Sequence, residues 1–178
     1  MESLEVIARP HFDKDDLAWL TDIRARRTGN RGAPYFTLVF PGAQLTPARF
    51  AERIRRSAQD IPRIRFRLRS ALVAPEPTVH RFHVFLIPDE GFGAISWLHD
   101  RLHEGPIEAA MRPDVPYLPH ITVGTSADPL AARKLAQALN QGGIDIAGHI
   151  ESLEVERQTG EVIHKVAEIP LAKTGWFH

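Results

Sequence analysis

The chain has 178 residues, of which 43% are hydrophobic and 25% are charged, with 22 basic and 22 acidic side chains and no cysteine. Such a composition is ordinary for a soluble globular protein, and the balanced charge gives no overall attraction to nucleic acid. Without cysteine the chain cannot form disulfides, zinc–cysteine sites or a catalytic thiolate. It also lacks a membrane-length apolar run and an N-terminal secretory pattern, so we expect a cytoplasmic protein without a membrane partner.

The first half of the sequence predicts two strands that alternate with two helices. Residues 3–9 read as a strand, and Asp13 can cap the helix that follows. The second strand is "PYFTLVF", residues 34–40, and Thr46-Pro47 is a typical start for the second helix. On the expected apolar face of the second strand lie Phe36, Leu38 and Phe40.

The second half predicts a longer series of strands with two more helices. Residues 62–75 alternate strictly, with four arginines on one face and apolar side chains on the other. A proline-rich connection, residues 112–119, cannot be helical. The other expected elements are a strand at 79–88, a helix at 89–105, a strand at 120–125, a helix between Asp128 and Gly142, and strands at 148–157 and 161–169. A turn at "QTGE" would join the last two strands as a hairpin.

An internal repeat runs through this order of elements. "PYFTLVFP" at 34–41 and "PHITVG" at 119–124 both place proline three positions before threonine, and each is followed within ten residues by a helix that starts with a capping residue and proline. Such self-similarity indicates two related lobes, each a small sheet with helices on one face. The two repeated strands would then lie side by side or face each other across a central groove.

The repeated strands carry a chemical pattern. Because residues i and i+2 point to the same side of a strand, His120 and Thr122 form one unit, and Tyr35 and Thr37 form the equivalent unit in the other copy. An imidazole can move a proton near neutral pH, and a hydroxyl can donate a hydrogen bond to a phosphate oxygen. Two facing units would suit in-line attack on a phosphodiester without a metal. The alternative for a lone H-x-T motif is an ordinary strand histidine, but the duplication argues against chance.

The sequences "PHITVG", "PYFTLVF", "FHVFLIPDEGF", "LHDRLHEGP" and "RPDVPYLPHITVG" resemble the two-histidine (2H) phosphoesterase superfamily, in particular the bacterial 2′-5′ RNA ligase-like proteins. The resemblance covers almost the whole chain. It implies an α+β fold in which residues 1–178 form one domain of two pseudo-symmetric lobes, a bilobal duplicated βαβ architecture. Two mainly antiparallel sheets would surround a central groove, with helices on the outer faces.

The resemblance also implies the chemistry. Members of the family cleave cyclic phosphates or 2′-5′ phosphodiesters, or join RNA ends, without a metal cofactor. Carried over by position, His120 and Thr122 fill the second motif and Thr37 fills the threonine of the first. The expected partners are therefore RNA ends or small cyclic or 2′-5′-linked nucleotides, with no cofactor and no metal, and we expect a monomer.

The sequence departs from the family pattern at Tyr35, where a histidine is expected. A phenol is almost fully protonated at neutral pH, so it can donate a proton but is a poor base. Three interpretations stay open: Tyr35 acts as the acid while His120 acts as the base, another histidine replaces the missing one, or the protein binds a phosphorylated ligand without turnover. His83, which alternation places beside Phe85 on one strand face, is the best substitute, although it can equally be a packing residue.

Two further groups are candidates for substrate binding. Arg65 or Arg67, from the four-arginine row, could bind phosphate oxygens in a bidentate manner. The row could instead be the solvated face of an edge strand, where charges oppose aggregation. Phe85 and Tyr117 could stack on a base, and both could equally be packing residues.

Overall fold

The computed structural model describes residues 2–40, 42, 45–76, 79–105 and 116–177. In these ranges the chain forms two sheets and the helices α1 (Lys14–Thr28), α2 (Pro47–Ala58), α3 (Phe92–His103) and α4 (Pro129–Gln141). Nearly all strand pairs are antiparallel, which confirms the predicted α+β class with two mainly antiparallel sheets. None of the helices in the described part of the chain has the length and hydrophobicity needed to span a bilayer.

The first sheet has the strand order β3 (Phe36–Val39), β1 (Glu2–Ala8), β8 (Ser152–Thr159) and β9 (Val162–Pro170). Helix α3 packs against β3, and α2 packs against β9. The apolar side chains between these helices and the sheet are fully buried, among them Phe50, Ile54, Ile95 and Leu98. One face of the first sheet is therefore core, and the other face is left for polar side chains.

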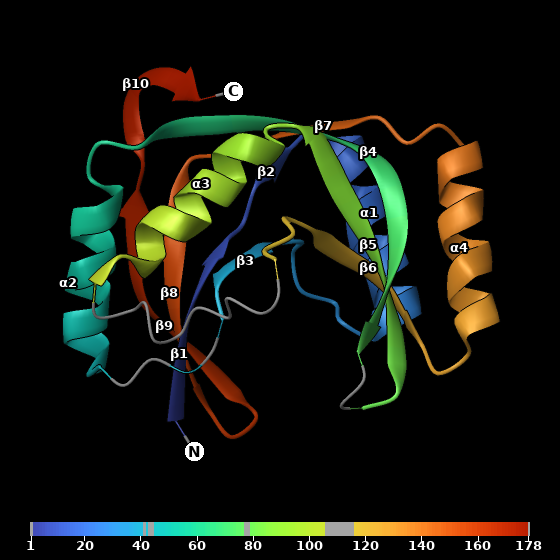
Figure 1. Cartoon of the computed structure of the whole chain (residues 1–178), viewed down its shortest axis with the longest axis horizontal. Coiled ribbons are helices and arrows are strands. Elements are labelled where there is room, and N and C mark those ends of the chain that lie inside the picture. The colour runs from blue at the N-terminus through green and yellow to red at the C-terminus, as the bar shows by residue number, and fades with distance from the viewer. Residues whose placement is uncertain (1, 41, 43–44, 77–78, 106–115, 178) are drawn as a thin grey trace.

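The second sheet has the order β2 (His11–Phe12), β7 (Ile146–Ile150), β4 (Pro62–Glu76), β5 (Arg81–Glu90) and β6 (Ile121–Ser126). Strand β10 (Ala172–Phe177) pairs in parallel with the beginning of β4. Helix α4 packs against β4, β5 and β6, and α1 packs against β6. In Figure 1, α2 and α4 lie at opposite ends of the molecule with both sheets between them, as expected for helices on the outer faces.

The helix starts follow from local hydrogen bonding. The Asp13 carboxylate accepts from the backbone N–H of Asp16 at 2.8 Å, and the Asp128 carboxylate accepts from Leu130 at 2.8 Å. Each bond satisfies a donor that the first turn of a helix leaves open. Thr46 makes no such side-chain bond, and Pro47 in the first turn marks this start instead.

Three strand predictions were wrong in detail. The run 148–157 is two strands in different sheets, because β7 ends at Ile150 and β8 begins at Ser152. Strands β2 and β10 were not predicted, since one has two residues and the other lacks regular apolar alternation. The strand at 34–40 is shorter than expected and ends at Val39, so Phe40 is exposed rather than part of the apolar face.

The two repeated strands lie at the edges of different sheets. Strand β3 ends the first sheet and β6 ends the second, so they are not hydrogen-bonded neighbours. In Figure 1, β3 lies near the middle of the molecule, and β6 lies to its right in the second sheet. Of the predicted connection at 112–119, residues 112–115 lie outside the described part of the chain.

Candidate functional site

His120 lies directly before β6 in a defined orientation. Its Nδ1 is 2.6 Å from the backbone oxygen of Leu118, and its ring stacks on Phe85 with 3.6 Å between ring centres and 19° between planes. A carbonyl oxygen can only accept, so Nδ1 carries the hydrogen and the neutral ring keeps a lone pair on Nε2. The local structure therefore leaves Nε2 of neutral His120 as a hydrogen-bond acceptor.

The surroundings of His120 favour its neutral form. Burial lowers the pKa of His120, the hydrogen bond to Leu118 acts in the opposite direction, and the nearby His83 lowers the pKa further. Burial disfavours a charged imidazole because the charge loses its hydration. A neutral imidazole at neutral pH is the form that can accept a proton from an attacking hydroxyl or water.

The predicted residues of β5 and β6 come together around His120. Phe85 is opposite Thr122 and His83 is opposite Thr125 in the strand pairing. The rings of His83 and Phe85 are nearly parallel, with 5.9 Å between their centres, and His83 Nδ1 lies 3.0 Å from the Thr125 hydroxyl. The side chains of His83, Phe85 and His120 thus form a continuous row of rings.

The first motif is joined to the second through Tyr117. Its hydroxyl donates to the backbone oxygen of Thr37 at 2.9 Å, and its ring stacks flat on His99 with 3.8 Å between centres. His99, from α3, is itself bound through Nδ1 to the oxygen of Leu38 at 2.6 Å. Burial raises the pKa of Tyr117, so its hydroxyl stays a donor. One face of the Tyr117 ring, considered above for base stacking, is covered by His99.

Tyr35, which the sequence suggested in place of a family histidine, lies near two guanidinium groups that both donate to the backbone oxygen of Ala33. Those of Arg9 and Arg24 are 5.5 and 5.2 Å from the centre of its ring. Arg24 is buried, with 3% of its surface exposed, and donates to the oxygen of Ala33 at 2.8 Å. Tyr35 lines a pocket of about 420 Å³, and neither His120 nor any other residue of the second motif is among the described residues around it.

The arginine row has its own partners. Arg67 makes two hydrogen bonds to the carboxylate of Asp145, at 2.8 and 2.7 Å, and the Arg65 guanidinium lies 4.0 Å from the centre of the Trp176 ring. Within the described chain, no contact joins either arginine to His120. Arg67 is therefore paired with a carboxylate, whereas Arg65 lies against an aromatic ring.

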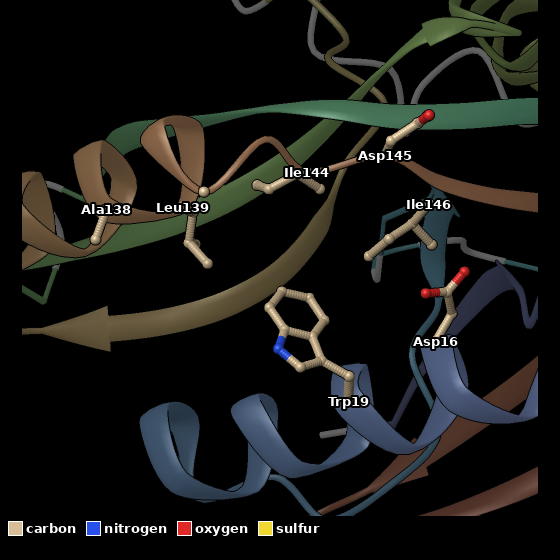
Figure 2. Close-up of a pocket in the computed structure, with 8 residues that line it drawn as sticks. Asp16, Trp19, Ala138, Leu139, Ile144, Asp145 and Ile146 are labelled. Carbon is tan, nitrogen blue, oxygen red and sulfur yellow. The ribbon is translucent and has the colours of Figure 1, made fainter.

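A separate pocket, which the sequence did not indicate, lies between α1 and the end of α4 (Figure 2). Its volume is about 400 Å³. Asp16 and Trp19 project into it from α1, opposite Leu139 and Ile144. The sequence shows that Asp16 and Trp19 have helical spacing and so lie on one face of α1. The residues on the other side of the pocket come more than 100 positions later in the chain, so no local pattern indicates the pocket. None of the predicted motif residues lines this pocket.

No group of three or more histidine, aspartate and glutamate side chains in the described ranges has the arrangement of a metal site. A comparison with protein families places the chain in a known context. The family model of the 2′-5′ RNA ligase superfamily matches residues 12–161. No curated protein matches the sequence.

Several solved structures share the fold. The protein TT0787 of Thermus thermophilus is 16% identical with a TM-score of 0.62, and the match covers 97% of this chain and 100% of that one. E. coli LigT complexed with 3′-AMP is 15% identical with a TM-score of 0.57, covering 97% and 99%. Kluyveromyces marxianus Usb1 is 10% identical with a TM-score of 0.56, covering 95% and 98%. At these identities the likeness is one of fold.

Proposed function

Because the chain belongs to the 2′-5′ RNA ligase superfamily, we propose that it acts on RNA ends or small nucleotides. The reaction is cleavage of a 2′,3′-cyclic phosphate or a 2′-5′ phosphodiester without a metal, or the joining of RNA ends through a 2′-5′ bond. Two of the similar structures contain nucleotides: LigT was solved with 3′-AMP and Usb1 with uridine monophosphate. Family membership thus agrees with the resemblance inferred from the sequence.

The orientation of His120 is the observation that carries the proposal. Its hydrogen bond to Leu118 and its stacking on Phe85 leave Nε2 as a fixed base. In hydrolysis of a cyclic phosphate, Nε2 takes a proton from water while the water oxygen attacks phosphorus. The bond from phosphorus to the 2′ or 3′ oxygen breaks, and that oxygen takes up a proton from an acid. Hydroxyl groups of Thr37 and Thr122 hold the phosphate oxygens.

Two side chains are candidates for the acid. Tyr35 occupies the equivalent position in the first motif, and its phenol can donate a proton. His83 is linked to His120 through Phe85 and has a hydroxyl partner in Thr125. An acid in the right place contributes about 10²–10⁴-fold to the rate. Replacing Tyr35 by phenylalanine and His83 by glutamine, one at a time, identifies the acid as the variant whose rate falls by that factor.

The proposed function is tested by turnover of 2′,3′-cyclic nucleotides and 2′-5′-linked oligonucleotides. We expect the wild-type protein to cleave at least one of them and His120→Ala to lose about 10²–10⁴-fold in rate. His164→Ala is the matched control, because His164 is an exposed histidine on β9. Equal activity of wild type and His120→Ala would rule out the role of His120.

A second function is favoured by the position of Tyr35. Tyr35 lines a pocket of about 420 Å³, where a ligand could bind, and the chain has no histidine at this point. The protein would then be a phosphate- or nucleotide-binding protein derived from the enzyme family. It predicts saturable binding of a nucleotide without turnover, and efficient turnover by the wild type contradicts it.

We further propose that the protein works in the cytoplasm as a monomer, without a cofactor, and that residues 1–178 act as one domain. Activity unchanged after treatment with a chelator, together with a single species of about the chain mass of 20.0 kDa in light scattering, is the expected result. Loss of activity on chelation that added metal restores would contradict the metal-free mechanism.

A further inference from the structure

The pocket next to Tyr35 has an ordered polar wall. Glu5, Ile7 and Arg9 alternate along β1 and line the pocket together with Tyr35. Ile7 is paired with Thr37 on β3, and residues that are directly opposite each other share a face of the sheet. The pocket therefore opens on the same face of the first sheet as Thr37, the hydroxyl of the first motif. We call it the Glu5 pocket.

The basic side chains of the Glu5 pocket are already neutralised. Arg9 donates to Glu156 at 2.9 Å, to Glu154 at 3.3 Å and to the backbone oxygen of Ala33 at 3.3 Å. Glu156 is buried, with 5% of its surface exposed, so its interaction with Arg9 is only weakly screened by water. Lys165 lies 3.7 Å from Glu154. These cations thus hold the wall in place and are poorly available to a further anion.

Glu5 differs from Glu156, the other carboxylate that lines the pocket in the described part of the chain. It lies directly opposite Glu156 on the neighbouring strand, and in the described part of the chain its carboxylate has no hydrogen-bond partner. Asn30 lines the same pocket, and its side-chain oxygen accepts from Gly32 N–H at 2.7 Å, which leaves the amide NH₂ as a donor. The pocket therefore offers a two-oxygen acceptor and a separate donor.

We propose that the Glu5 pocket holds the base of a guanine nucleotide, with the Glu5 carboxylate accepting hydrogen bonds from the N1–H and the 2-amino group. The amide of Asn30 donates to the O6 oxygen. This inference rests on the proposed function, because it names the base preference of the same site. It makes Glu5 a specificity-determining residue close to the first motif.

The hydrogen-bonding edges of the four bases support this choice. Guanine presents two adjacent N–H donors beside an oxygen acceptor on its Watson–Crick edge. Adenine, cytosine and uracil each present only one donor group there, next to at least one acceptor that an ionised carboxylate repels. A carboxylate has only acceptor sites, so it can pair with both of its oxygens only to the guanine edge. Proteins that read single-stranded RNA recognise bases by such edge contacts.

The rest of the pocket is compatible with a planar base. Its volume of about 420 Å³ is ample for one, and the exposed Ile163 gives it apolar surface. Tyr35 is fixed as a wall by the guanidinium groups of Arg9 and Arg24. The tyrosine thus forms part of the base-binding wall in this chain.

The inference is tested first with the wild-type protein, by calorimetric titration with GMP, IMP, AMP and UMP. IMP keeps the N1–H and O6 of guanine but lacks the 2-amino group, so the comparison needs no mutation. We expect GMP to bind on the order of tenfold more tightly than AMP or UMP, with IMP in between. Equal binding of the four nucleotides overturns the inference, and so does the absence of binding by all four.

The second test is Glu5→Gln, compared with Asp16→Asn as a control for loss of a carboxylate in the other pocket. Glu5→Gln removes a half-buried charge that faces Glu156, so we expect it to fold. GMP affinity should fall on the order of tenfold in Glu5→Gln, while its AMP affinity stays unchanged. The Asp16→Asn protein should bind both nucleotides as tightly as the wild type. Unchanged GMP affinity overturns the inference. The proposed function fails separately, if His120→Ala cleaves as well as wild type while the GMP preference remains.

Discussion

The hydroxyl of Tyr117 donates a hydrogen bond to the backbone oxygen of Thr37, and this bond of 2.9 Å joins the two motifs. Tyr117 lies three residues before His120, and Thr37 is the hydroxyl residue of the first motif. Strand β3 is at an edge of its sheet, so one side of its backbone needs partners from outside the sheet. Tyr117 and His99 supply two of them, at Thr37 and Leu38.

Tyr117→Phe should therefore lower both stability and rate. The change leaves the Thr37 oxygen without its partner in a partly buried place, which costs about 1 kcal/mol in the free energy of unfolding. The distance between the motifs also becomes less well fixed, so we expect kcat to fall more than KM changes. Denaturant titration and steady-state kinetics measure the two effects. A stable variant with full kcat would show that the bond does not position the motifs.

His83→Gln tests the influence of His83 on the base. The electrostatic influence of His83 is one of the causes that lower the pKa of His120, so replacing His83 should raise that pKa towards the ordinary value of about 6.5. A base works only when deprotonated, so activity is lost as the pH falls through its pKa. The acid limb of kcat/KM should then move to higher pH in His83→Gln and stay in place in His164→Gln. If the acid limb of kcat/KM does not move in His83→Gln, His83 does not affect the pKa of His120.

Protonation of His99 should destabilise the fold at acidic pH. The pKa of His99 is lowered in the folded protein, and burial of the imidazole is the main cause. The unfolded chain therefore binds a proton more readily, so stability is complete above the unfolded pKa of about 6.5 and decreases as the pH falls from there towards the folded pKa. His120 adds a contribution of the same sign.

His99→Gln should reduce that pH dependence. We expect a loss of about 1–3 kcal/mol at pH 7.5, since the hydrogen bond to the Leu38 oxygen is weakened, and a smaller further loss at pH 5 than in wild type. Urea titrations at both pH values provide the measurement. If the two proteins lose the same free energy between these pH values, His99 is not a source of acid sensitivity.

The division of residues 148–157 between two sheets left a trace in the sequence. Ile146 and Ile150 are buried at even positions, whereas Leu153 and Val155 are buried at odd positions. The apolar phase thus changes near Glu151, where the chain passes from the second sheet to the first. A change of phase within a strand means a change of the face that is buried. The alternation predicted the strands themselves, and the shift in phase was the missed signal for the crossing.

The parts of the site that could not be predicted depend on distant partners. Alternation did place His83 and Phe85 on one face, and the structure shows their rings in one row with His120. By contrast, the carboxylate of Asp145 that pairs with Arg67 comes 78 residues later. No local pattern reports such a pair, because it depends on which strands become neighbours. The same holds for Arg9 and Arg24 around Tyr35.

Tyr35→His tests whether the missing histidine limits the activity. The two guanidinium groups near this position would lower the pKa of the introduced imidazole, because they disfavour a third positive charge. With two histidines whose pKa values are both low, one must be protonated and one neutral for acid–base catalysis. The optimum should therefore lie below pH ~6.5, the ordinary histidine pKa.

At that optimum we expect Tyr35→His to exceed the wild-type rate by about 10²-fold or more, the contribution of a positioned acid or base. The gain should disappear when His120→Ala is added, because the second histidine is then absent again. A rate equal to that of an active wild type would mean that Tyr35 or His83 already supplies the proton. A Tyr35→His protein that binds nucleotides but remains inactive would favour the binding function, because the site would then lack something besides that histidine.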